Sequence, residues 1–199
     1  MSEKAFIRPE VLTPINTEHC SEKIKLNLYE KSMLECTVID KNETVLCLYS
    51  NNEGFFNSLP SNNFVFGLNK NLEDYNTLKN SNINAEISFQ TTEDMPFENE
   101  FFNHLIIAQP LHKINNLDNV LSEAFRMLKS GGQLIFSCNY APFNSHKIIN
   151  SFCKDEFGFQ RDMFLSKDFI TKKIKNNFFQ NLDFYLQYGF INVGTAWKR

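Results

Sequence analysis

The sequence predicts an α/β domain built on a mostly parallel sheet with helices on both faces. Short apolar runs of strand length alternate with segments of helical periodicity, a pattern typical of a parallel sheet that is buried on both sides. The length of 199 residues suits one such domain, and 42% apolar with 22% charged residues are the proportions of a globular chain. We therefore expect a single domain, 1–199, with an N-terminal helical segment (1–40), a Rossmann-like core (44–138) and a Phe-rich C-terminal part (140–199).

Charge and composition exclude several classes of function. A net charge of −3 argues against broad electrostatic binding to nucleic acid or to an anionic membrane. The N-terminus has no apolar leader and no stretch reaches the length of a membrane span, so we expect a cytoplasmic protein. The five cysteines form no CxxC pair, which predicts reduced, buried thiols. The histidines have no metal-ligand spacing, so we expect no metal site.

Six strands and six helices are expected after residue 40, and the segment before it ends in a helix for which Thr17 is a plausible N-cap. The expected strands are 44–49, 63–68, 83–89, 102–108, 133–138 and 190–198. The expected helices are 53–59, 72–79, 116–129, 146–154, 166–177 and 181–188. Gly131 and Gly132 follow the helix at 116–129 and are expected to end it as a C-cap.

Residues 95–137 read MPFENEFFNHLIIAQPLHKINNLDNVLSEAFRMLKSGGQLIFS. This stretch resembles the class I S-adenosylmethionine (SAM) dependent methyltransferases, in the branch with the malonyl-carrier-protein and ubiquinone-pathway enzymes. The matching residues are Met95-Pro96-Phe97, Leu111-His112, Glu123-Ala124, Arg126-Met127-Leu128-Lys129 and Gly131-Gly132. The resemblance implies a Rossmann-like methyltransferase fold with six or seven strands, because only one strand fits after residue 189, and it implies SAM as the cofactor.

The cofactor motifs depart from the family. Where the family reads VLDLGCGTG at its first strand, this sequence reads VLCLYSNNEG. Cys47 stands at the position of the family's acid, and Tyr49 and Asn51 stand at the positions of its first two glycines. A shift of one residue restores Gly54 as the last glycine. Glycines in this loop allow a positive φ and a close approach of the ligand to the backbone. In place of the first one, the Tyr49 side chain would either cap the methionine pocket or pack as a core aromatic. Asn51 or Asn52 would keep the shape of the turn, because asparagine tolerates the left-handed conformation.

Three further acids of the family are also replaced. The position that grips the ribose hydroxyls is Asn69, the position near adenine is Thr91, and the acid before the fourth strand is Asn103. An amide can bind a hydroxyl but gives up the stronger bonds of a carboxylate. The resemblance also places Gln109, at the end of the fourth strand, at the mouth of the pocket.

The candidate cofactor-binding residues stand at the cofactor-binding positions of the family or next to them. They are Tyr49, Asn51, Gly54, Asn69, Thr91, Thr92 and Gln109. No catalytic residue is predicted, since a lone histidine after a strand, here His112, is more often a structural hydrogen-bonding group than a general base.

Two functions remain open. The first is a methyltransferase-fold protein with weakened or lost SAM binding, acting as a non-catalytic regulatory or scaffolding partner. It would pair with a protein partner or a second copy through the Phe-rich C-terminal part, or hold a small apolar or acyl-type ligand. The alternative is an active, divergent SAM-dependent methyltransferase acting on a small molecule or a carrier-bound acid. Other chemistry in this fold would need metal or redox ligands, for which the sequence offers no convincing set.

Overall fold

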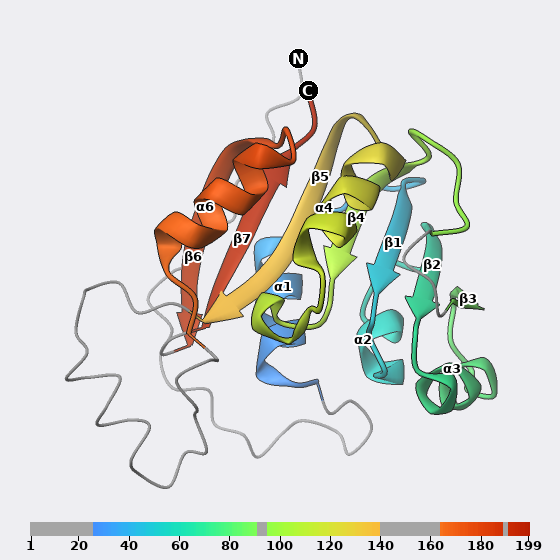
Figure 1. Ribbon diagram of the computed structural model, residues 1–199. Helices are drawn as coiled ribbons and strands as arrows, with labels where there is room; N and C mark the ends of the chain where they lie inside the picture. The colour runs from blue at the N-terminus through green and yellow to red at the C-terminus, as the bar shows by residue number, and fades with distance from the viewer. Residues whose placement is uncertain (1–25, 91–94, 140–163, 189–190) are drawn as a thin grey trace, which may run out of the picture.

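The computed structural model describes residues 26–90, 95–139, 164–188 and 191–199. Seven strands form one sheet in the order β3-β2-β1-β4-β5-β7-β6, with the first five parallel and β7 antiparallel to both of its neighbours (Figure 1). The strands are β1 (Thr44–Leu48), β2 (Phe64–Asn69), β3 (Glu86–Phe89), β4 (Phe102–Ile107), β5 (Leu128–Asn139), β6 (Gln180–Tyr188) and β7 (Ile191–Trp197). The expected α/β class with a mostly parallel sheet is confirmed. Of the two expected strand numbers, six or seven, the sheet has seven.

Helices pack on both faces of the sheet. The helices are α1 (Leu28–Cys36), α2 (Glu53–Asn57), α3 (Leu72–Lys79), α4 (Leu117–Met127) and α6 (Lys167–Asn176), with a short 3-10 helix, η2 (Leu111–Lys113). Apolar side chains of α4 and α6 join one buried cluster with β4 and β5. Those of α1, α2 and α3 join a second cluster on the opposite face. The two clusters cover the central strands β1 and β4, in which every residue except Thr44 and Asn103 is buried.

Side-chain caps fix where several helices begin. Asn27 begins α1 as a capping box with Glu30, Asn71 accepts from two backbone amides at the start of α3, and Ser166 caps α6. These starts agree with the expected helices at 72–79 and 166–177. The expected N-cap Thr17 and the expected helix at 146–154 lie outside the described residues.

Two sequence predictions in this part of the chain are wrong. Residues 181–188, expected as a helix, form most of β6, and the half-buried Leu182 and Phe184 alternate with exposed neighbours at the period of a strand. Gly131 and Gly132 do not end α4, because Leu128 is already extended and the pair lies inside β5. The chain there takes a positive φ at Gly131, beside a register irregularity between β4 and β5.

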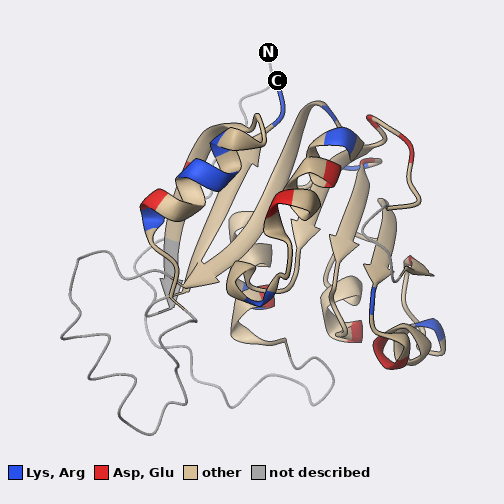
Figure 2. Cartoon of the chain, in the orientation of Figure 1, with Lys and Arg blue, Asp and Glu red and all other residues tan. Residues whose placement is uncertain are grey.

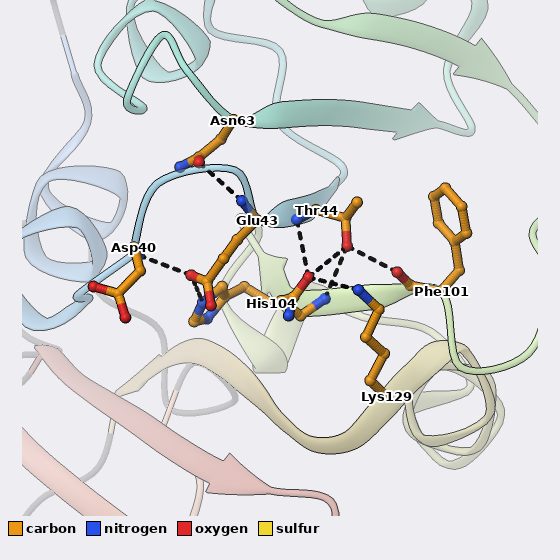
Figure 3. A network of polar contacts seen from close by, with 8 residues as sticks. Asp40, Glu43, Thr44, Asn63, Phe101, His104 and Lys129 are labelled. Atoms are coloured by element: carbon orange, nitrogen blue, oxygen red, sulfur yellow. Dashed lines mark hydrogen bonds and ion pairs between the residues drawn. The ribbon is translucent and has the colours of Figure 1, made fainter. Parts of the chain in front are cut away.

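The amino ends of β1 and β4 are joined by a polar network (Figure 3). His104 Nε2 lies 2.7 Å from Glu43 Oε2, and Asn63 Oδ1 accepts a hydrogen bond from the Glu43 backbone amide. Asn103 Oδ1 accepts from the Thr44 amide and from the Lys129 ammonium. Asn103, where the resemblance expects an acid before the fourth strand, therefore has a structural role at the amino edge of the sheet. Gln109 lies beyond the opposite end of β4.

Replacing Gly194 with alanine should destabilise the fold. Gly194 pairs with Phe136 across β5 and β7, and an added Cβ would lie 2.2 Å from the Phe136 ring. Overpacking of this kind costs about 1–3 kcal/mol. Chemical denaturation should show that loss for Gly194→Ala and almost none for Lys172→Ala at an exposed position of α6. Equal stability of the two variants would contradict this packing.

Candidate functional site

The order of the strands reverses between β1 and β4, and parallel α/β sheets bind ligands at the carboxyl ends of the strands beside such a point. The loop after β1, Asn69 at the end of β2 and Gln109 after β4 all lie at this edge. Of the seven candidate residues, five are thus brought to one edge. Thr91 and Thr92 lie outside the described residues.

Tyr49 takes the left-handed backbone conformation at the first position after β1, with φ 63°. Its amide donates to the Leu68 carbonyl at 2.8 Å, so the turn is tied to β2. The half-buried ring packs against the α4-face core, and the Lys70 ammonium lies 4.6 Å from the ring centroid. The expectation that Asn51 or Asn52 would provide the left-handed residue is wrong: the positive φ is at Tyr49, where the family has glycine.

The rest of the loop begins α2. Asn52 has an extended backbone, and its Oδ1 accepts from the Gly54 amide at 2.9 Å as the N-cap of this helix. Gly54 is buried in the first turn, whereas Asn51 is exposed. Acidic residues lie in the first turns of both α2 and α3 (Figure 2).

A buried carboxylate from α1 binds this loop. Glu30 is 1% exposed, and its Oε1 accepts from the Ser50 hydroxyl at 2.9 Å. Its Oε2 accepts from the Asn52 amide nitrogen Nδ2 at 2.8 Å and from the Asn27 backbone amide at 3.3 Å. The Ser50 Oγ in turn accepts from the Asn52 backbone amide. One acid on a helix distant in sequence therefore holds two side chains of the loop.

Burial raises the pKa of Glu30, because loss of water outweighs the hydrogen bonds that favour its ionised form. The same burial raises the pKa of the Cys47 thiol, with a smaller contribution from the nearby Glu30 charge. Cys47 is fully buried at the end of β1. The charge of Glu30 thus influences a thiol that lies 17 positions away in the sequence.

Asn69 is directed toward the loop. It is 2% exposed, and its Nδ2 donates to the Ser50 carbonyl at 2.8 Å. The amide that the resemblance assigns to the ribose hydroxyls is therefore engaged by the protein itself. It links the end of β2 to the same loop that Glu30 holds from the other side.

Gln109 differs from the other candidates. Its Oε1 is buried and has no hydrogen-bond partner within the described part of the chain. A buried acceptor without a partner is costly, and a ligand or water that donates a hydrogen bond would remove that cost. His112, in η2, is half-buried with its ring 6.4 Å from that of Tyr29 on α1.

Sequence reasoning missed Glu30, Ser50 and the α1 side of the site. The spacing of Asn27 and Glu30 is a capping-box signature, and both halves of the box are present. That signature explains Glu30 as a local helix feature and gives no sign of its contacts with residues 50 and 52. A buried acid in a helix with little apolar character is the signal that could have drawn attention to it.

Comparisons with known proteins agree with the fold described above. Residues 57–136 match the profile of the methyltransferase domain family. No curated protein sequence gives a significant match.

Solved structures match nearly the whole chain. A SAM-dependent methyltransferase from Thermotoga maritima superposes with a TM-score of 0.65 at 15% identity, over 86% of this chain and 89% of that one. Another from Methanosarcina mazei has a TM-score of 0.60 at 12% identity, over 80% and 94%. A third structure is a complex of the Haloferax volcanii methyltransferase activator Trm112 with a methyltransferase, with a TM-score of 0.60 at 13% identity over 84% and 87%.

Residues 57–136 therefore resemble the methyltransferase domain family, and the chain shares the fold of class I SAM-dependent methyltransferases. At these identities the solved structures establish the fold, and the chemistry of this member has to be argued from its own residues. SAM is the cofactor of the family. Within the described ranges there is no cluster of three or more His, Cys, Asp or Glu side chains that could hold a metal ion, and no helix long and apolar enough to cross a membrane.

Thiol labelling should distinguish the cysteines of this methyltransferase fold. Cys47 and Cys138 are buried, and burial raises the pKa of Cys138 to about 12 and that of Cys47 further, so both lack thiolate at neutral pH. Iodoacetamide at about pH 8 should leave both unmodified in the native protein and modify the half-exposed Cys36. Peptide mass spectrometry measures this, and labelling of Cys47 as fast as of Cys36 would contradict the packing at the end of β1.

The pKa of Glu30 gives a pH dependence with a definite sign. Because the folded pKa is raised above 4.5, the stability that Glu30 contributes is complete below that value and declines as pH rises through the folded pKa. The Cys47 thiol stays protonated over this range, because burial raises its pKa. Between about pH 4 and pH 8, the melting temperature of Glu30→Gln should therefore rise relative to that of the wild type as pH increases. A constant difference would contradict the shift, and exposed Glu35→Gln on the same helix is the control.

Proposed function

We propose that this chain is a methyltransferase-fold protein in which SAM binding is weakened or lost, and that it acts as a non-catalytic regulatory or scaffolding partner. The observation that carries the proposal is the engagement of Asn69. Its Nδ2 is buried and donates to the Ser50 carbonyl, so the group at the ribose position is directed into the protein.

The loop after β1 supports the same conclusion. Its polar side chains Ser50 and Asn52 are engaged by Glu30 and by the start of α2. A ligand that needs them must first break bonds worth about 0.5–1.5 kcal/mol each, more for those to a charged group. No carboxylate at Cys47 or Asn69 offers the ligand a charge-assisted bond in return.

A role through protein contacts is supported by exposed aromatic surface. Phe178 is 73% exposed in a left-handed conformation after α6, and its ring lies 5.8 Å from that of half-buried Phe125 on α4. Exposed aromatic side chains of this kind are enriched at interfaces. The Haloferax relative is bound to a protein activator, so a neighbour of this fold engages a partner.

An active methyltransferase is the second candidate, favoured by two observations. Tyr49 keeps the left-handed turn after β1, so the backbone retains a conformation that the glycine motif provides elsewhere. Gln109 Oε1, which has no hydrogen-bond partner among the described residues, offers a ligand one buried acceptor after β4. In this case positioning of the donor and acceptor molecules would supply most of the catalysis.

Calorimetry with SAM and with S-adenosylhomocysteine separates the two candidates. The proposal predicts no binding in the micromolar range by the purified protein. Asn69→Ala should change nothing for either ligand, because Asn69 serves the loop. Micromolar binding of SAM that Asn69→Ala abolishes would overturn the proposal.

Methyl transfer is the matching test of activity. Purified protein, methyl-labelled SAM and a fractionated small-molecule extract should give no transferred label above a heat-inactivated control. Gln109→Leu provides the second arm, because it removes the free acceptor with little change in size. Transfer that this variant reduces at least about tenfold would support the active enzyme instead.

A further inference from the structure

Helix α1 packs on the sheet through both apolar and polar contacts. Its buried residues are Glu30, Ser32 and Met33, and the Ser32 hydroxyl donates within the helix to the Leu28 carbonyl. Among these three, Glu30 is thus the one whose side chain hydrogen-bonds another element. Tyr29 beside it accepts from the Asn139 amide at 3.0 Å, at the end of β5.

The contacts of Glu30 continue into the loop and into α2. Ser50 donates to one carboxylate oxygen and Asn52 Nδ2 to the other. Because Asn52 Nδ2 is fixed in this way, its Oδ1 faces the Gly54 amide and caps α2. The orientation of the Asn52 amide, and with it the start of α2, is therefore set from α1.

The other side of the loop has a separate support. Asn69 donates to the Ser50 carbonyl from β2, and the Tyr49 amide donates to the Leu68 carbonyl. These bonds hold the backbone of the loop to β2 but do not orient the side chains of Ser50 and Asn52. Glu30 holds both of these side chains from α1.

We propose that Glu30 is a positioning residue that couples the docking of α1 to the conformation of the ligand loop, residues 49–54. When α1 leaves the sheet, the loop side chains lose their orientation, and when the loop rearranges around a ligand, α1 loses its buried anchor. The coupling is a property of the chain itself. It holds whether or not the loop binds SAM, so it can fail or stand independently of the proposed function.

The chemistry of the contact distinguishes two substitutions. Glutamine keeps one acceptor for Asn52 and Asn27, and its NH2 group can donate to the Ser50 hydroxyl, which is both donor and acceptor. Alanine removes both acceptor oxygens and leaves the buried Ser50 hydroxyl without the oxygen to which it donates. Glu30→Gln should therefore preserve the coupling, and Glu30→Ala should remove it.

Hydrogen exchange followed by peptide mass spectrometry tests the proposal on the full-length protein without ligand. Glu30→Ala should increase amide exchange at least about tenfold in two segments together, α1 and residues 49–54, with β4 and β5 unchanged. Glu30→Gln and the control Glu35→Gln should exchange as the wild type does.

The reciprocal variant keeps the test decisive if Glu30→Ala does not fold. The change in Asn52→Ala lies outside α1, at the N-cap of α2. It should nevertheless increase exchange in α1 as well, because a coupling between two sites acts in both directions. Faster exchange confined to the loop in Asn52→Ala, or to α1 in Glu30→Ala, would overturn the proposal. So would a Glu30→Gln variant that exchanges as fast as Glu30→Ala.

Discussion

The buried carboxylate of Glu30 is the interaction on which the carboxyl edge of this sheet depends. It brings a helix outside the strand–helix alternation into contact with the loop that follows the first strand. The loop satisfies its polar groups with Glu30 from one side and Asn69 from the other. A loop whose polar side chains already bond within the protein has less to gain from binding a ligand, which is the physical basis for proposing a weakened cofactor site on a methyltransferase fold.

Much of the fold could be predicted from the sequence, because its strands and helices have clear periodicity and caps. β1, β2 and α3 lie within two residues of their expected positions. The errors fall where a local signal has two meanings. A Gly-Gly pair after a helix is typical of a C-cap, but here it allows a strand to start with an irregular register. Residues 181–188 alternate weakly, and their pairing with β7 decides their structure.

The site was less predictable. The positions of Tyr49, Asn69 and Gln109 at one edge follow from their places at or after the ends of strands that run parallel, because the carboxyl ends of such strands lie at the same edge of a sheet. The contacts of these residues do not, because they depend on Glu30, which comes from a helix whose sequence points only to local capping. The direction of the Asn69 side chain is likewise a tertiary result: the same amide could face a ribose or the loop, and Ser50 decides it.

A crystal structure of the protein soaked with S-adenosylhomocysteine tests the central claim most directly, since it shows both the ligand and the groups that would hold it. The account predicts no ligand density beside the loop, with Asn69 still donating to the Ser50 carbonyl and Glu30 still bound to Ser50 and Asn52. Density for the nucleoside with the Asn69 amide turned onto its ribose hydroxyls would contradict the account.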